Sequence, residues 1–220
     1  TFNFLRGATT GFTAQAMGAG DRVAEQRMLL SGLIIALVAG LLLLLFQGPI
    51  GVLGMSVMGA DGIVAEAATT YFHWRIWSAP FVLFNFVAFG WLIGHGEAMW
   101  SMILQTLLNG LNAALSMHWV IGLGWGVEGV AIATLVAEAV TAVAGAVLIL
   151  AKTDRSAWRL PDIPAIRRSF AVNGDMMIRS FALLIGLSFF TRQSGFLGID
   201  VLAANTILLR FYFFGVAFLD

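Results

Sequence analysis

Residues 28–47 read MLLSGLIIALVAGLLLLLFQ, and no charged residue occurs between positions 28 and 60. A helix needs about 20 mostly apolar residues to cross the hydrocarbon core of a bilayer. This stretch meets that requirement, and the residues Gln47-Gly48-Pro49 end it. Strands of a membrane barrel alternate apolar and polar positions, whereas positions 41–46 are apolar throughout. The sequence therefore predicts a transmembrane helix.

The composition of the whole chain agrees with this prediction. Of its 220 residues, 60% are hydrophobic and 11% are charged, against roughly 45–50% and about 25% in soluble domains. Twelve basic residues balance twelve acidic ones, so nothing favours a nucleic-acid partner. Cysteine is absent, which excludes disulfides and thiolate metal sites. We expect an integral membrane protein in contact with lipid, without a cofactor.

Further apolar stretches predict additional spans. They cover residues 64–93, 99–121, 127–151, 165–191 and 199–219, and residues 1–17 read as the second half of another helix. We therefore expect an all-α, polytopic bundle of about seven transmembrane helices. Because the chain starts at Thr1 with part of a helix, we interpret it as a piece of a longer protein.

Basic residues in the loops predict the orientation, because cytoplasmic loops of membrane proteins are enriched in lysine and arginine. Seven basic residues lie in two loops, and one lies near an outer turn; they are Arg22, Arg27, Lys152, Arg155, Arg159, Arg167 and Arg168, against Arg192. We therefore expect the loops at 18–27, 94–98 and 152–168 to be cytoplasmic.

The charged, proline-bearing stretch at 152–164 predicts a boundary between two helix bundles. We expect an N-terminal bundle over residues 1–151 that lacks its first helix. A cytoplasmic linker follows over 152–164. Residues 165–220 then form the first two helices of a C-terminal bundle.

Polar residues within predicted spans are candidates for function, because burying them in lipid is unfavourable. Asn109, Asn112 and Ser116 share one helix face. Their oxygens are ligands that hard cations accept, and the same groups also form hydrogen bonds between packed helices. Both interpretations remain open.

A second polar stripe lies on the next helix, at Thr134, Glu138 and Thr141. Glu138 falls near the middle of the predicted span. A carboxyl group removed from water can carry a proton. The alternative is a glutamate paired with a basic residue of another helix, and the sequence does not separate the two.

Other intramembrane charges favour structural roles. Arg75 and Tyr71 either line a cavity or hold helices together, and we favour the second interpretation. Asp175 and Arg179 are four positions apart on one helix, a spacing at which the two charges neutralise each other. We expect both pairs to be accessory or structural.

Enzyme signatures are missing. The sequence has no His-Glu-x-x-His, no Gly-x-Ser-x-Gly, no paired aspartate motif and no phosphate-binding glycine loop. Three histidines without cysteine argue against a metal site. The missing signatures argue against a membrane enzyme, and the polar stripes within the predicted spans argue against a passive scaffold.

Several motifs together resemble one transporter family. They are GFTAQAMGAGDR at 11–22, Tyr71-x-x-x-Arg75-x-x-x-x-Pro80, Asn109-x-x-Asn112-x-x-Leu115, GVEGVAIAT at 126–134 and LAANTIL at 202–208. The combination is similar to multidrug and toxic compound extrusion (MATE) transporters, in particular the DinF-like branch. It extends over nearly the whole chain.

The resemblance implies a twelve-helix antiporter of two six-helix bundles in the bacterial inner membrane. It would export bulky drugs or organic cations in exchange for protons or sodium, as a monomer. An alternative within the superfamily is a flippase of lipid-linked precursors, which needs a cationic cavity. The candidate residues for such a cavity are Arg6, Arg75, Arg179 and Arg210.

The resemblance also implies an ion site in the N-terminal bundle. The family uses an aspartate on helix one, an asparagine and an aspartate on helix five, and a threonine on helix six. Asn112 and Thr134 match this pattern, whereas Ser116 stands at the second aspartate position. The first aspartate would precede Thr1. Since one carboxylate is lost, we predict coupling to protons through the helix-one carboxylate, with Glu138 as an accessory group.

Overall fold

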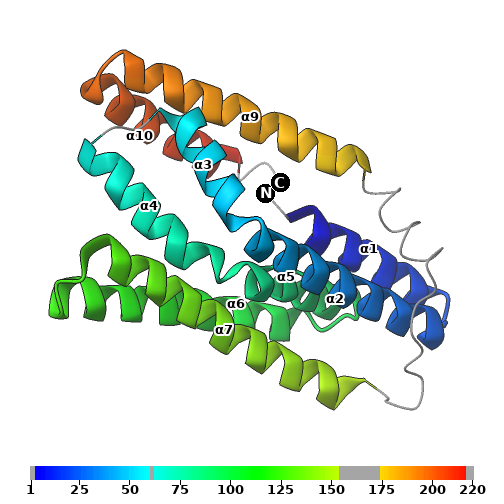
Figure 1. Cartoon of the computed structure of the whole chain (residues 1–220). Coiled ribbons are helices and arrows are strands. Elements are labelled where there is room, and N and C mark those ends of the chain that lie inside the picture. The colour runs from blue at the N-terminus through cyan, green and yellow to red at the C-terminus, as the bar shows by residue number, and fades with distance from the viewer. Residues whose placement is uncertain (1–2, 60–61, 154–173, 217–220) are drawn as a thin grey trace.

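The computed structural model describes residues 3–59, 62–153 and 174–216, and every regular element in these ranges is a helix (Figure 1). In chain order they are α1 (Asn3–Gly18), α2 (Arg22–Leu45), α3 (Gln47–Met58), α4 (Gly62–Ile76), α5 (Ala79–Gly94), α6 (Ala98–Met117), the π-helical turn η1 (His118–Gly122), α7 (Gly126–Lys152), α9 (Gly174–Phe196) and α10 (Ile199–Val216). The predicted all-α fold is confirmed.

Local sequence signals set several helix boundaries. Asp21 caps α2, since its Oδ1 accepts a hydrogen bond from the backbone N–H of Ala24 at 2.9 Å. Gly59 ends α3 in the left-handed conformation, with φ of 60°. Pro80 lies in the first turn of α5, where its missing N–H costs no helical hydrogen bond.

The stretch at 64–93, which the sequence predicts as one span, is divided into α4 and α5. The two helices meet at a bend of 56°. Pro80 explains the break, because its ring clashes with the carbonyl four residues earlier in a continuous helix. The bend therefore separates Arg75 on α4 from the apolar body of α5.

Two of the described helices, α2 and α7, are long and apolar enough to cross a membrane, and α4 with α5 adds a third if the bent pair is one span. The helices α1, α6, α9 and α10 lie at the positions of the other predicted spans. The count of about seven spans stays a prediction. The stretch after Gln47, expected as a loop or a short surface helix, is the helix α3.

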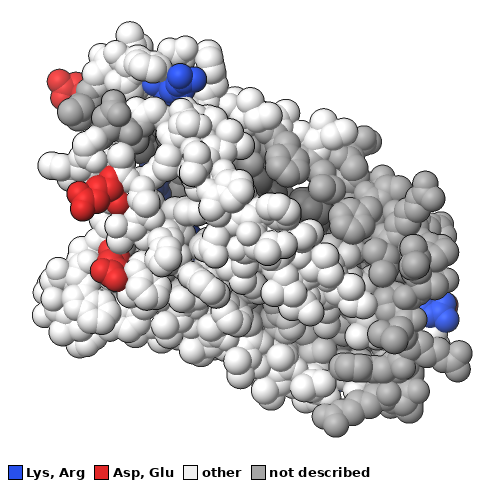
Figure 2. Space-filling view, viewed as in Figure 1, with Lys and Arg blue, Asp and Glu red and all other residues white. Residues whose placement is uncertain are grey.

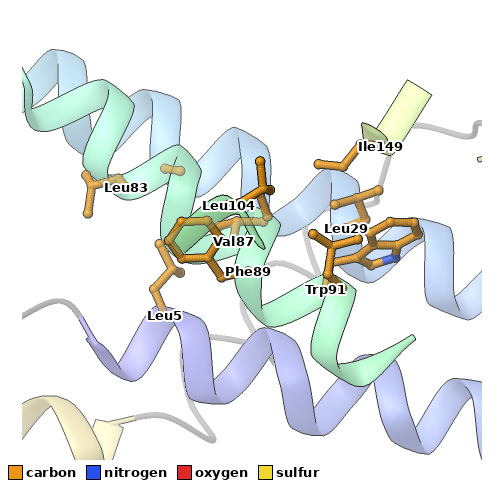
Figure 3. Packing of buried hydrophobic residues seen from close by; sticks show 11 residues of the cluster. Leu5, Leu29, Leu83, Val87, Phe89, Trp91, Leu104 and Ile149 are labelled. Carbon is orange, nitrogen blue, oxygen red and sulfur yellow. The ribbon is translucent and has the colours of Figure 1, made fainter. Parts of the chain in front are cut away.

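Helix α5 is the centre of the packing. It contacts α1, α2, α6 and α7 (Figure 1). The buried apolar cluster joins all five helices (Figure 3); its labelled members are Leu5, Leu29, Leu83, Val87, Phe89, Trp91, Leu104 and Ile149. Most residues on α5 therefore face the rest of the bundle rather than lipid.

Small residues allow the helices to approach α5 closely, as is common in membrane bundles. A Cβ atom on Gly90 would lie 2.5 Å from the carbonyl oxygen of Arg6 on α1. A Cβ atom on Gly40 would lie 2.7 Å from the Cα atom of Pro80. Both glycines therefore fix how α1 and α2 pack against α5.

Large apolar side chains cover much of the described surface. On α2 and α7 they include Leu37, Leu41, Leu45, Val143 and Val147, each more than half exposed. The charged side chains visible on the described surface lie near the helix ends (Figure 2). An apolar surface of this extent is typical of a protein face in contact with lipid.

Candidate functional site

Three of the residues predicted from the polar stripes meet between α6 and α7. Nδ2 of Asn112 donates a hydrogen bond to Oγ1 of Thr134 at 3.2 Å. The hydroxyl of Ser116 donates to Oδ1 of Asn112 at 3.0 Å. These contacts join two neighbouring helices. They agree with the interpretation of helix packing. They also bring three side-chain oxygens together, as an ion site requires.

Helical spacing positions these side chains. Asn112 and Ser116 are four residues apart, so they lie on one face of α6. Thr134 donates its own proton to the carbonyl oxygen of Val130 at 2.9 Å, which leaves its hydroxyl oxygen free to accept from Asn112. Asn109 is exposed and does not join this cluster.

Glu138 lies at the middle of the 27-residue helix α7 and is 8% exposed. Its partner is Asn85 on α5, which is 2% exposed. Nδ2 of Asn85 donates to the Glu138 carboxylate oxygen Oε2 at 2.7 Å and to the Glu138 backbone oxygen at 3.1 Å. One amide group therefore holds both the side chain and the backbone of Glu138.

The backbone contact fixes the orientation of the amide. A carbonyl oxygen can only accept, so the NH2 group of Asn85 must point toward α7. Its Oδ1 atom is then directed elsewhere, and it is buried without a hydrogen-bond partner. The same holds for Oγ1 of Thr141, one turn after Glu138. Buried polar atoms without a hydrogen-bond partner are rare in folded proteins. Here one belongs to the residue that contacts the Glu138 carboxylate, and the other lies three positions after Glu138 on the same helix.

In the described part of the chain, no ion pair involves Glu138. Arg75 acts on it only through its charge. Its guanidinium instead donates to the hydroxyl of Ser78, at the bend between α4 and α5. The alternative in which a basic residue of another helix pairs directly with Glu138 therefore receives no support from the hydrogen bonds.

The remaining predicted residues belong to α4 and α9. Tyr71 is on the exposed side of α4. Asp175 and Arg179 belong to α9, and their side chains lie outside the described residues. Among the residues that are described, no three His, Asp or Glu side chains come together as a metal site requires.

Sequence reasoning missed Asn85 as a site residue. The signal was available, because Asn85 is an amide within the apolar stretch FVLFNFVAF at 81–89. Its contact with Glu138 could not be read from the sequence, since 53 positions separate the two residues. The partly buried pair of Glu25 and His95 was missed for the same reason, at a separation of 70 positions.

A polar cluster within a bundle of apolar helices is typical of transport proteins. Comparison with known proteins identifies the family of this chain. The model of the MatE family matches residues 2–118, which is more than half of the chain. The chain belongs to the MatE family. The resemblance inferred from the motifs is thereby confirmed.

Among curated MatE-type relatives, DNA damage-inducible protein F of Escherichia coli (strain K12) is 36% identical over 226 residues. The alignment covers 99% of this chain and 48% of that protein. The chain therefore spans about half the length of the curated relative it matches.

Two solved structures resemble the fold of this MatE chain closely. A MOP superfamily transporter from Pyrococcus furiosus Vc1 has a TM-score of 0.84 at 27% identity, covering 97% of this chain and 49% of that one. A multidrug resistance MATE family transporter in an outward-facing conformation also has a TM-score of 0.84, at 26% identity, with the same coverage. Both are transporters rather than enzymes, and the MatE chain is a multi-pass membrane protein.

Proposed function

We propose that the full-length protein is a secondary antiporter that exports bulky, often cationic organic molecules in exchange for protons. In this proposal residues 1–151 belong to the N-terminal bundle, 152–164 form the cytoplasmic linker and 165–220 open the C-terminal bundle. Transport needs both bundles, which rock about a central cavity in transporters of this type. The chain thus supplies the ion-binding half of a monomeric transporter.

The observation that carries the proposal is the carboxylate of Glu138, buried at the middle of α7 with a neutral partner. A charge at the bilayer centre costs roughly 2.5–3.5 kcal/mol on insertion scales, and such residues are usually functional. Binding of a proton removes that charge, and release restores it. Since Asn85 links Glu138 to α5, each change acts on the contact between two helices.

The cluster of Asn112, Ser116 and Thr134 supports a second, neutral part of the same ion site. Its oxygens belong to one amide and one hydroxyl side chain on α6 and to one hydroxyl side chain on α7. None of the three carries a formal charge, and hard cations prefer sites that contain carboxylates. This supports protons over sodium as the coupling ion.

The alternative of a lipid-linked precursor flippase has less support. Such a protein needs arginines gathered around a diphosphate. Arg6 donates to Gln105 on α6 at 3.1 Å, whereas Arg75 donates to Ser78. The two guanidinium groups are thus bound to different partners.

Transport by the full-length protein in proteoliposomes tests the proposal. A fluorescent cationic dye is followed first under a pH gradient and then under a sodium gradient at constant pH. We expect dye movement under the pH gradient alone. Movement driven by sodium would overturn proton coupling, and no movement under either gradient, with folded protein, would overturn antiport in favour of the flippase.

One variant separates a transporter from a scaffold. Asn112→Ala removes the amide that joins Ser116 to Thr134. We expect normal membrane insertion and reduced dye transport. A variant that inserts and transports at the wild-type rate would show that this cluster serves packing only.

A further inference from the structure

A pocket of about 430 Å³ lies on the predicted cytoplasmic side, where α1, α5 and α7 end and α2 begins. None of the residues predicted from the sequence as site residues lines it. Its lining includes both charged and aromatic side chains: Met17, Arg22, Glu25, Trp91, His95 and Lys152.

Glu25 and His95 form a partly buried contact in this pocket. Nδ1 of His95 lies 2.5 Å from Oε1 of Glu25. Glu25 is 7% exposed, whereas the imidazole is partly open to the pocket. Trp91 stacks on the imidazole, with ring centroids 4.7 Å apart and an interplanar angle of 19°. The stacking holds the ring in the orientation that directs Nδ1 to Glu25.

The charged groups around the pair are few. Helix α1 has no charged residue after Arg6, and α6 has none. The charges on the other neighbouring elements are Asp21, Arg22 and Arg27 at the start of α2, Glu97 before α6, and Lys152, Glu138 and Glu128 at the end, middle and start of α7. Asp21 caps α2, and Lys152 pairs with Glu97 at 2.6 Å. Glu25 therefore has His95 as its direct titratable partner among the described residues.

We propose that Glu25 and His95 form a proton-binding site that holds the cytoplasmic ends of α2 and α5 together. With a proton on the imidazole, the contact is an ion pair. When that proton leaves, a buried carboxylate remains with a neutral hydrogen-bond partner, and the contact weakens. A rise in cytoplasmic pH therefore loosens α2 from α5 and widens the pocket.

This site is distinct from Glu138 and goes beyond the proposed antiport. Asn85, the partner of Glu138, and His95 are ten positions apart on or at the end of α5, which corresponds to about 15 Å along the helix. The pair responds to the proton concentration on one side of the membrane. It does so whichever ion drives transport.

Distance measurement across the pocket tests the proposal. Spin labels are attached to Met17→Cys on α1 and Thr153→Cys at the end of α7 in the full-length protein, with any cysteine outside this cysteine-free chain replaced. Distances are recorded by pulsed electron paramagnetic resonance in vesicles without a substrate or an ion gradient. We expect a shift to longer distances as the pH rises from about 5.5 to 8.5, the range in which histidine titrates.

Two histidine variants complete the experiment. His95→Gln should abolish the pH-dependent shift, and so should Glu25→Gln. The second variant replaces the first in the test if His95→Gln does not fold. His118→Gln, which changes an exposed histidine in η1, should retain it. A wild-type protein without a shift, or a folded His95→Gln variant that shifts like the wild type, would overturn the proposal. Because transport is not measured, failure of the antiport proposal would leave this result unaffected.

Discussion

Two buried carboxylates on different helices have opposite kinds of partner. Glu138, at the middle of α7, accepts a hydrogen bond from the neutral amide of Asn85. Glu25, in the first turn of α2, contacts the imidazole of His95, which can carry a positive charge. Asn85 lies within α5, and His95 follows directly at its C-terminal end. A carboxylate with a neutral partner changes its net charge when a proton binds, whereas a carboxylate beside a histidine gains or loses an ion pair.

In our proposals this difference separates two tasks. In the hydrocarbon core a change in net charge is energetically large, so the state of Glu138 can drive a rearrangement of helices. Glu25 and His95 lie at the helix ends, where the imidazole is partly open to the pocket. There we propose that their proton adjusts how closely α2 and α5 pack.

The largest effect on transport is expected from Glu138→Gln. Glutamine has the same shape and keeps an oxygen that accepts from Asn85, yet it cannot bind or release a proton. We expect the initial rate of dye transport under a pH gradient to fall about tenfold or more, equivalent to about 1.4 kcal/mol in the barrier. The rate is measured with the full-length protein in proteoliposomes.

Glu128→Gln is the matched control for that variant. Glu128 lies at the start of the same helix, is exposed and accepts a hydrogen bond from Nε1 of Trp74 at 3.0 Å. Its loss should leave the transport rate near that of the wild type. Equal rates for the wild type and Glu138→Gln would remove the basis for assigning the two carboxylates different tasks.

Gly90→Ala tests whether both carboxylates depend on the position of α5. The added Cβ atom would lie 2.5 Å from a backbone oxygen of α1, so the helices must separate. Such overpacking typically costs about 1–3 kcal/mol. We expect a lower unfolding temperature of the full-length protein in detergent. Gly11→Ala, where a Cβ atom meets nothing within 4 Å, should not lower it, and an equal loss for both variants would contradict the packing argument.

Asn85→Leu tests the partner of Glu138 directly. Removal of the amide leaves the carboxylate without its donor, and we expect a loss of about 1–2 kcal/mol in stability. The double variant Asn85→Leu/Glu138→Leu removes both polar groups and should regain part of this loss. Thermal unfolding of both variants measures the difference. A double variant less stable than Asn85→Leu would indicate that the two residues do not depend on each other.

The smallest effect is expected from Lys152→Met, which breaks the pair with Glu97. Their side chains are 24% and 35% exposed, and partly exposed ion pairs contribute less than about 1 kcal/mol. The unfolding temperature should therefore change little. A loss as large as that of Asn85→Leu would show that the predicted cytoplasmic edge is held by more than the contact of Glu25 with His95.

The sequence is enough to identify this chain as a bundle of membrane helices, because hydropathy and helix length are local properties of a segment. The motifs around Asn112 and Thr134 likewise indicated the family and a cluster between two consecutive helices, since residues with helical spacing share a face whatever the rest of the fold does. The break in the span at 64–93 was accessible through Pro80 but was not predicted. Local patterns do not measure how far a proline bends a helix.

Which polar residues meet across distant helices depends on the tertiary structure. Asn85 and Glu138 are 53 positions apart, and Glu25 and His95 are 70 positions apart. Their contacts depend on how closely α1, α2 and α7 approach α5, which in turn depends on glycines such as Gly40 and Gly90. Helix periodicity specifies the face on which a side chain lies. The helix opposite that face is chosen by the packing of the whole bundle.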